Sequence, residues 1–411
     1  MNPETLDHPH GPRALLKTIR ALPVGIWALG FGSMFMDISS ELVHSLLPVF
    51  MVSTLGASMV TIGILEGVAE ATAAITKVFS GALSDYLGKR KFLLVSGYAL
   101  AAFTKPVFPL ATSISWVFGA RFVDRVGKGI RGAPRDALVA DISPPQLRGA
   151  AFGLRQALDS IGALLGPLLA VVCMVWLADD IRTVLWIGVL PAFIAVALLI
   201  VFVREPEHAS EGDIGKRGPA LANFRRLPLR YWLVVLLGGL FTLARFSEAF
   251  LVLRARDVGL SLGLVPLVMV VMNLFYAAFA YPAGAAADRV RPRTLLLIGL
   301  ALLIVADILL ALATTPLVAF VGAALWGLHM AFTQGLFAKL VADHSPAGLR
   351  GTAFGVFNLI SGVALLLASV IAGALWSARG AEATFAVGGL FAGLTALGLL
   401  CYRPANEQKS R

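Results

Sequence analysis

Apolar runs separated by short polar segments make up almost the whole chain. Twelve such runs can be traced, and most are close to the ~20 residues that a helix needs to cross a bilayer. Their continuity favours helices, because the strands of a transmembrane barrel would be shorter and alternating. The predicted spans lie at about 24–52, 58–83, 92–111, 114–130, 150–176 and 183–203, and then at about 231–253, 263–285, 295–313, 316–338, 352–376 and 384–402.

Composition leads to the same class. Hydrophobic residues make up 58% of the chain and charged residues 14%, and the mean hydropathy is +0.83. These values predict an all-α integral membrane protein with twelve transmembrane helices. Residues 1–22 are polar and the first span is too long for a signal peptide, so no cleaved signal is expected. Both cysteines fall in predicted spans, so the sequence predicts no disulfide framework.

The net charge of +10 does not indicate a nucleic-acid partner once the basic residues are placed. If the N-terminus is cytoplasmic, only four basic residues fall in outer loops: Arg182, Arg254, Arg256 and Arg379. This bias predicts that both termini lie in the cytoplasm of a multi-pass inner-membrane protein. The basic residues then meet membrane lipid, and no nucleic acid is expected.

The chain contains an internal repeat. VADISPPQLRGAAFG at 139–153 and VADHSPAGLRGTAFG at 341–355 share 11 of 15 residues at an offset of 341 − 139 = 202. This duplication predicts two parallel halves of six helices each. The expected domains are an N-terminal half at 1–203 with a cytoplasmic tail at 1–22, a cytoplasmic linker at 204–230, a C-terminal half at 231–402 and a tail at 403–411.

The loop between the second and third predicted spans carries a recognisable motif. It contains Gly81, Asp85, Gly88, Lys89 and Arg90 within GALSDYLGKRK. This stretch closely resembles motif A of the major facilitator superfamily, a family of membrane transporters. The resemblance covers the whole chain, including the twelve spans, the duplicated halves and the central linker.

A second copy of the motif begins at Gly284 and contains Asp288 and Arg289. Arg289 is the basic residue of the family pattern, which Tyr86 replaces in the first copy. The resemblance implies that Asp85 faces the N-terminus of the eleventh span and acts as a conformational latch between the halves. The alternative is a loop that only sets topology, since a cytoplasmic basic cluster does that by itself.

Two further motifs are partial. Arg121 in the fourth span begins a stretch similar to motif B of the family, although Asp124 and Arg125 replace the usual Gln and Gly. Gly162, Gly166 and Pro167 in the fifth span are similar to motif C of drug–proton antiporters, without its trailing glycines. The resemblance therefore implies helix bending and close packing in the fifth span, and it favours an antiporter.

Charged residues inside the spans predict the functional site. A charge in hydrocarbon is costly, so most of these residues must face a water-filled cavity or one another. At a rise of ~1.5 Å per residue, Asp37, Glu70 and Asp124 fall within ~3 Å of the bilayer centre. The predicted substrate and proton site comprises Asp37, Glu41, His44, Glu66, Glu70, Arg121, Asp124, Arg125, Asp159, Arg245 and Glu248.

Internal ion pairing is the competing interpretation. Arg155 with Asp159 and Arg245 with Glu248 have helical spacings that would also suit structural pairs. Lys105 and Asp307, both about a turn outward of a span midpoint, are interpreted as structural. For Asp37, Glu41 and His44, which form one helical stripe, we predict a position facing the central cavity.

Other chemistry has weaker support. Glu41-x-x-His44 is half of a di-iron pattern, but the only other Glu-x-x-His lies in the polar linker. Copper transport would use Met269, Met272, His329 and Met330, although Met is common in apolar helices as a space filler. The chain has no nucleotide-binding loop, HExxH helix or GxSxG elbow, so neither an enzyme nor a cofactor or resident metal is expected.

The sequence thus predicts a secondary transporter that moves a small molecule together with protons by alternating access. Export of a drug or metabolite is favoured through the partial motif C, and a monomer is expected. Three alternatives stay open: a proton-coupled importer of an organic anion held by Arg121, Arg125 and Arg245, a copper transporter, and a non-transporting membrane receptor.

Overall fold

A computed structural model of the chain describes residues 21–87, 89–205, 227–287, 290–333, 335–346 and 349–401. Throughout these residues the regular structure is helical, and none of them forms a strand. Ten helical segments are long and apolar enough to cross a membrane, and the charged helix α6 and the interrupted helix α10–α11 occupy the two remaining predicted spans. The predicted fold class is therefore confirmed.

Several predicted positions fall outside the described residues. They are Gly88, Asp288 and Arg289, the side chain of Asp85, most of the linker at 204–230 and both tails. The latch and the linker consequently stay predictions.

The first half contains the predicted spans one to six. Its helices are α2 (Val24–Ser53), α3 (Met59–Leu87), α4 (Arg90–Thr104), α5 (Val107–Leu110), α6 (Ile114–Ile142), η1 (Pro145–Leu147), α7 (Arg148–Trp176), α8 (Ile181–Ile187) and α9 (Val189–Phe202). The second half contains α10 (Leu229–Leu243), α11 (Ala249–Asp257), η3 (Leu262–Leu264), α12 (Leu267–Ala287), α13 (Pro292–Ala311), α14 (Pro316–Thr333), α15 (Leu336–Asp343), α16 (Arg350–Arg379) and α17 (Ala381–Cys401).

The fourth span is longer than its hydropathy predicts. The apolar run ends near residue 130, whereas α6 continues to Ile142. Its second part carries Arg131, Arg135, Asp136 and Asp141, which lower the hydropathy without breaking the helix. The fourth span therefore reaches well beyond its predicted end.

The seventh span is broken at mid-length, although the sequence predicts one continuous helix. α10 ends at Leu243 and α11 begins at Ala249. In the break, the Ser247 hydroxyl accepts a hydrogen bond from the Ala249 N–H at 3.2 Å, and the Ser247 N–H donates to the Ser369 hydroxyl at 3.2 Å. These side-chain hydrogen bonds stabilise irregular backbone away from water, as buried backbone requires.

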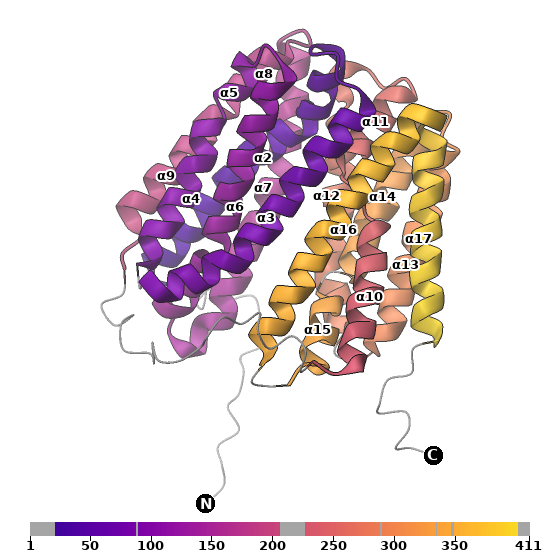
Figure 1. Cartoon of the computed structure of the whole chain (residues 1–411). Coiled ribbons are helices and arrows are strands. Elements are labelled where there is room, and N and C mark those ends of the chain that lie inside the picture. Colours follow the sequence, from indigo (N-terminus) through magenta and orange to yellow (C-terminus); the bar gives the residue numbers. More distant parts are fainter. Residues whose placement is uncertain are drawn as a thin grey trace, which may run out of the picture.

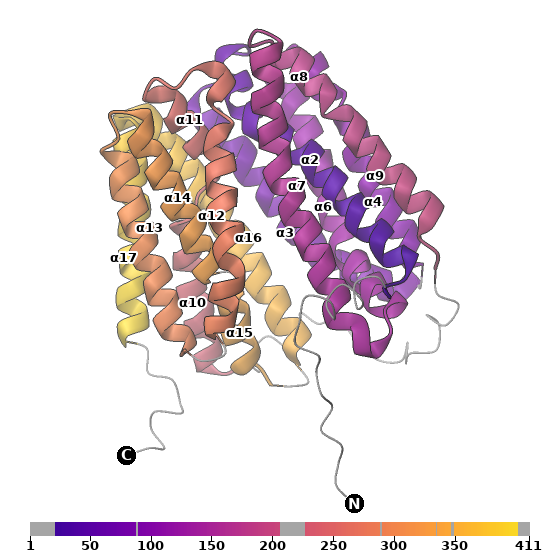
Figure 2. The ribbon, with the colours of Figure 1, turned by 180° about the vertical axis from the view of Figure 1, so that it is seen from behind.

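The two halves lie side by side and separate towards one end (Figure 1, Figure 2). We call the end where α2 begins and α17 ends the proximal end, and the end that carries α5, α8 and α11 the distal end (Figure 1). At the distal side, one apolar core joins residues of both halves, such as Phe50 and Met174 with Leu251 and Val265. Towards the proximal end each half has a separate core, around Tyr98 in the first half and Tyr231 in the second.

Glycines allow the distal contact to close. α3 and α16 run against each other, and a Cβ added at Gly63 would lie 2.2 Å from the Ser369 carbonyl oxygen. A Cβ at Gly373 would lie 2.3 Å from the Met59 carbonyl oxygen. Only glycine permits backbones to approach this closely.

Candidate functional site

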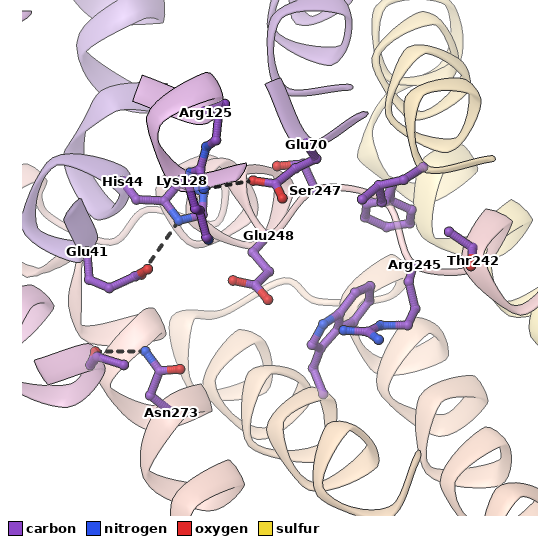
Figure 3. A pocket seen from close by; sticks show the side chains of 14 residues that line it. Glu41, His44, Glu70, Arg125, Lys128, Thr242, Arg245, Ser247, Glu248 and Asn273 are labelled. Atoms are coloured by element: carbon purple, nitrogen blue, oxygen red, sulfur yellow. Dashed lines mark hydrogen bonds and ion pairs between the residues drawn. The ribbon is translucent and has the colours of Figure 1, made fainter. Parts of the chain in front are cut away.

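A cavity of about 350 Å³ lies between the halves. Figure 3 shows side chains from both halves converging on it. From the first half it is lined by Glu41, His44, Glu70, Arg125, Lys128 and Ala163, and from the second half by Thr242, Arg245, Phe246, Ser247, Glu248, Asn273, Trp326 and Leu365. The break between α10 and α11 thus forms part of the cavity wall.

Ion pairs organise the first-half wall. Glu70 on α3 lies 3.3 Å from Arg125 on α6, and Glu41 lies 3.6 Å from His44, one turn along α2. Dashed lines in Figure 3 mark both pairs. This wall therefore presents carboxylates that already have partners.

A second layer of ion pairs lies behind this wall. Arg121 on α6 donates to Glu66 on α3 at 2.9 Å, and both side chains are almost fully buried. Lys105, at the end of α4, donates to Asp124 on α6 at 2.9 Å and is also buried. These pairs cross-link α3, α4 and α6, which fixes the wall in place.

Glu66 also contacts the second half. The Ser247 hydroxyl donates to the Glu66 carboxylate at 3.4 Å, and His44 Nε2 lies 3.8 Å from the same oxygen. A buried carboxylate of α3 is therefore joined to the break in the seventh span. This contact must be released for the halves to separate at the distal side.

Asp37 and Asp159 lie in a third group, where α2, α6 and α7 meet. Arg155 donates to Asp159 at 2.8 Å, and Arg135 lies 3.6 Å from Asp159 while donating to the Ser33 hydroxyl at 2.6 Å. Asp37 is half-buried and packs close to α7, because a Cβ added at Gly162 would lie 3.0 Å from the Asp37 Cβ.

The second-half wall combines charge with aromatic rings. Arg245 lies over the Phe241 ring with its guanidinium carbon 5.6 Å from the ring centroid. Phe246 packs on Trp326 at 5.4 Å between centroids, and Trp326 packs on His329 at 5.6 Å. The second half thus contributes most of the apolar surface of the cavity.

The motif residues act through packing. A Cβ at Gly162 or Gly166 would meet a carbonyl oxygen of α2 at 2.6 or 2.7 Å, so both glycines allow α7 to lie against α2. Pro167 follows inside α7. Gly81 faces Ala133 of α6, with 3.5 Å from an added Cβ, Lys89 is the N-cap of α4, and Arg90 pairs with Asp141 of α6.

Gly284 differs from these glycines, since an added Cβ would meet no atom within 4 Å. It lines a second cavity of about 290 Å³ with residues of α7, α12, α14 and α15. The described residues contain no group of three or more His, Cys, Asp or Glu that would hold a metal ion.

The cavity includes residues that the sequence prediction left out. Lys128, Asn273 and Trp326 all line it, and the Asn273 amide donates to the Ala163 carbonyl across the halves at 3.0 Å. Lys128 follows Arg125 by three residues on the same helix face, a spacing that predicts a shared orientation. Asn273 is a lone amide in an apolar span, which is itself a functional signal in a membrane protein.

The position of the first-span stripe makes a prediction for cysteine labelling. Glu41 and His44 line the cavity, whereas Leu42, Val43 and Leu46 are at most 1% exposed. Single cysteines at 37, 41 and 44, in a background lacking Cys173 and Cys401, are expected to react with a small hydrophilic thiol reagent. Cysteines at 42, 43 and 46 should stay unreactive. If cysteines at all positions from 36 to 47 are unreactive, Asp37, Glu41 and His44 are instead buried in ion pairs that water does not reach.

Comparison with known proteins identifies the family. A family model described as Major Facilitator Superfamily matches residues 29–255 and again residues 245–411. The chain belongs to the major facilitator superfamily. The resemblance inferred from motif A is thereby confirmed.

Individual relatives agree with this assignment. The chain is 32% identical over 389 residues to an uncharacterized MFS-type transporter of Methanocaldococcus jannaschii, with 93% of this chain and 95% of that protein covered. It is 26% identical over 351 residues to the inner membrane transport protein YajR of Escherichia coli, covering 81% and 73%. The solved nucleoside transporter NupG (D323A mutant) superposes with a TM-score of 0.76 at 14% identity, covering 92% of this chain and 98% of that one. The protein is thus a multi-pass membrane transporter of the superfamily.

Proposed function

We propose that this superfamily member is a proton-coupled secondary transporter of a small organic molecule, working by alternating access, with export as the favoured direction. The observation that carries the proposal is the central cavity, because both halves build it and three carboxylates, Glu41, Glu70 and Glu248, line it. Cavity carboxylates near mid-membrane can take up and release protons as their surroundings change.

The arrangement of the halves supports alternating access. They share one apolar core on the distal side and have separate cores towards the proximal end. A carrier of this kind rocks its halves about a fixed central site. With both termini in the cytoplasm, as the basic-residue bias predicts, this arrangement is the state that opens inward. An inner-membrane location agrees with the Escherichia coli relative YajR, which is named an inner membrane transport protein.

Export is supported by the partial motif C, whose glycines pack α7 against α2. The direction of transport can be tested in proteoliposomes by imposing a proton gradient of either sign and measuring solute movement. An exporter that exchanges solute for protons drives the two in opposite directions, whereas a proton-coupled importer moves them together. A membrane receptor on this scaffold would move neither.

Two carboxylates are expected to be required for coupling. Asp37→Asn and Glu70→Gln should each abolish solute accumulation driven by a proton gradient, because the amide cannot exchange a proton. Folding and membrane insertion should be retained, since the amide keeps the shape of the protonated acid and Arg125 keeps Asp124 at 3.9 Å when Glu70 is neutralised. Uptake into proteoliposomes and the elution profile of the purified protein measure the two effects.

The matched control for this experiment is Glu382→Gln. Glu382 lies exposed in the first turn of α17, away from the cavity, and its replacement should leave transport unchanged. Wild-type accumulation in both Asp37→Asn and Glu70→Gln would contradict the role of these acids as proton carriers.

A further inference from the structure

The cavity wall contains cations that lack a counter-ion. Arg125 is paired with Glu70, but Lys128 and Arg245 have no carboxylate within 4.0 Å among the described residues. Lys128 is exposed and Arg245 is half-buried. They come from opposite halves, Lys128 from α6 and Arg245 from the break after α10, and Figure 3 shows Glu248 between them.

A count of the unpaired charges gives the sign of the missing partner. Glu41 lies beside His44 and Glu70 beside Arg125, which leaves Lys128, Arg245 and Glu248 without close partners in the described wall. When His44 carries a second proton, its charge offsets that of Glu41, and the two cations and one carboxylate that remain leave one positive charge. An anion bound between Lys128 and Arg245 would accept charge-assisted hydrogen bonds from both, which are stronger than neutral ones.

The cavity cations of α6, Arg125 and Lys128, are a property of the first half and not of the fold. Helices α6 and α14 begin at equivalent positions of the repeat, since 316 − 114 = 202. The same offset places Gly327 at the position of Arg125 and Met330 at the position of Lys128. A transporter span of this kind therefore does not need these cations to fold, which favours a role in binding.

The surface beside Arg245 is aromatic. Phe246 and Trp326 line the cavity, and the buried Trp326 indole N–H has no hydrogen-bond partner in the described structure. A solute with an apolar or aromatic body would cover both rings, and a polar atom on it would accept from the indole. A cavity of about 350 Å³ has the size of a small-molecule site.

We infer that the transported solute is an organic anion with an apolar or aromatic body, its anionic group held between Lys128 and Arg245 and its body against Phe246 and Trp326. The inference rests on the proposed transport function and specifies its substrate class. The sequence predicts Arg121 in an anion site, but Arg121 forms an ion pair with Glu66 instead. Because Lys128 and Arg245 belong to different halves, the bound anion draws the halves together and favours the occluded state.

A matched series of probes tests the sign of the charge. The purified protein is incubated with 3-phenylpropionate, 3-phenylpropylamine or 3-phenylpropanol, which share a skeleton and differ in charge, and its melting temperature is recorded. The acid is expected to stabilise the protein, and the amine and the alcohol are not. Loss of one charge-assisted contact, at ~1.5–3 kcal/mol, should weaken binding of the acid by roughly 10- to 100-fold in Arg245→Gln and in Lys128→Gln.

The controls separate binding from folding. Arg245→Lys keeps the charge and should retain part of the affinity, and Arg379→Gln removes an exposed cation at the end of α16 and should have no effect. Melting temperatures without a probe show whether each variant folds. Stabilisation by the amine or the alcohol in place of the acid, no response to the acid, or an equal response in wild type and both Gln variants would overturn the inference.

Failure of the substrate class is distinguishable from failure of the proposed function. The same protein in proteoliposomes is challenged with anionic, cationic and neutral metabolites and antimicrobials while internal pH is followed. If only cationic or neutral solutes drive proton movement, the proposed transport function stands and the proposed anionic substrate class is overturned. Proton movement driven by anions and lost in Arg245→Gln supports both.

Discussion

Glu66→Ala is expected to destabilise the first half by about 3–5 kcal/mol, because it leaves the Arg121 guanidinium buried without its counter-ion. Glu66 is 0% and Arg121 1% exposed, so water cannot replace the lost carboxylate. The Ser247 contact between the halves is lost as well. The measurements are the yield of membrane-inserted protein and its melting temperature in detergent.

The double variant provides the control. Replacing a buried ion pair by apolar residues of similar volume is often close to neutral, so Glu66→Leu combined with Arg121→Met should recover much of the lost stability. If the double variant is as unstable as Glu66→Ala, the loss reflects packing and not the uncompensated charge.

Gly63→Val is expected to prevent closure of the distal contact. The added Cβ would lie 2.2 Å from the Ser369 carbonyl oxygen, which is backbone and cannot rotate away. Overpacking of about 3 kcal/mol would change the ratio of distal-closed to distal-open states by roughly a hundredfold. A cysteine at Ala372, which is 2% exposed on α16, should become reactive to a hydrophilic thiol reagent, and transport should fall.

Gly119→Val serves as the matched substitution, since an added Cβ at Gly119 has no atom within 4 Å. It should leave both the labelling and transport unchanged. Protection of the cysteine at 372 in Gly63→Val, together with normal transport, would show that the α3–α16 contact adjusts to the extra volume.

The bilayer explains how much of the fold the sequence predicts. A span needs a long apolar run in any membrane protein, so the apolar runs predicted an all-helical membrane fold, and the repeat predicted two halves. Hydropathy does not show whether the helix is continuous within an apolar run. The break at 244–248 depends on hydrogen bonds from Ser247 and Ser369, and Ser369 is 122 residues away in the chain.

The sequence predicts how deep a charged residue lies in the membrane, but not which ion-pair partner it has. Depth along a helix placed Glu70 near the bilayer centre, and Glu70 lines the cavity. Depth alone could not show that Asp124 lies behind the wall with Lys105, because the partners of a side chain on other helices depend on how each helix is rotated. Lys128 was overlooked for a different reason. The predicted span ended near 130, whereas α6 runs from 114 to 142, so Lys128 lies at its midpoint.

The charges of α6 also have a consequence for biogenesis. Each charged residue at the centre of a helix opposes its insertion by about 2.5–3.5 kcal/mol, and α6 carries Arg121, Asp124, Arg125 and Lys128 there. It is absent from the segments that are apolar enough to cross a membrane alone. Its counter-ions Glu66, Glu70 and Lys105 all precede it in the chain. Because the chain is made from its N-terminus, α3 and α4 are synthesised before α6, and the partners for its charges are already present when the fourth span inserts.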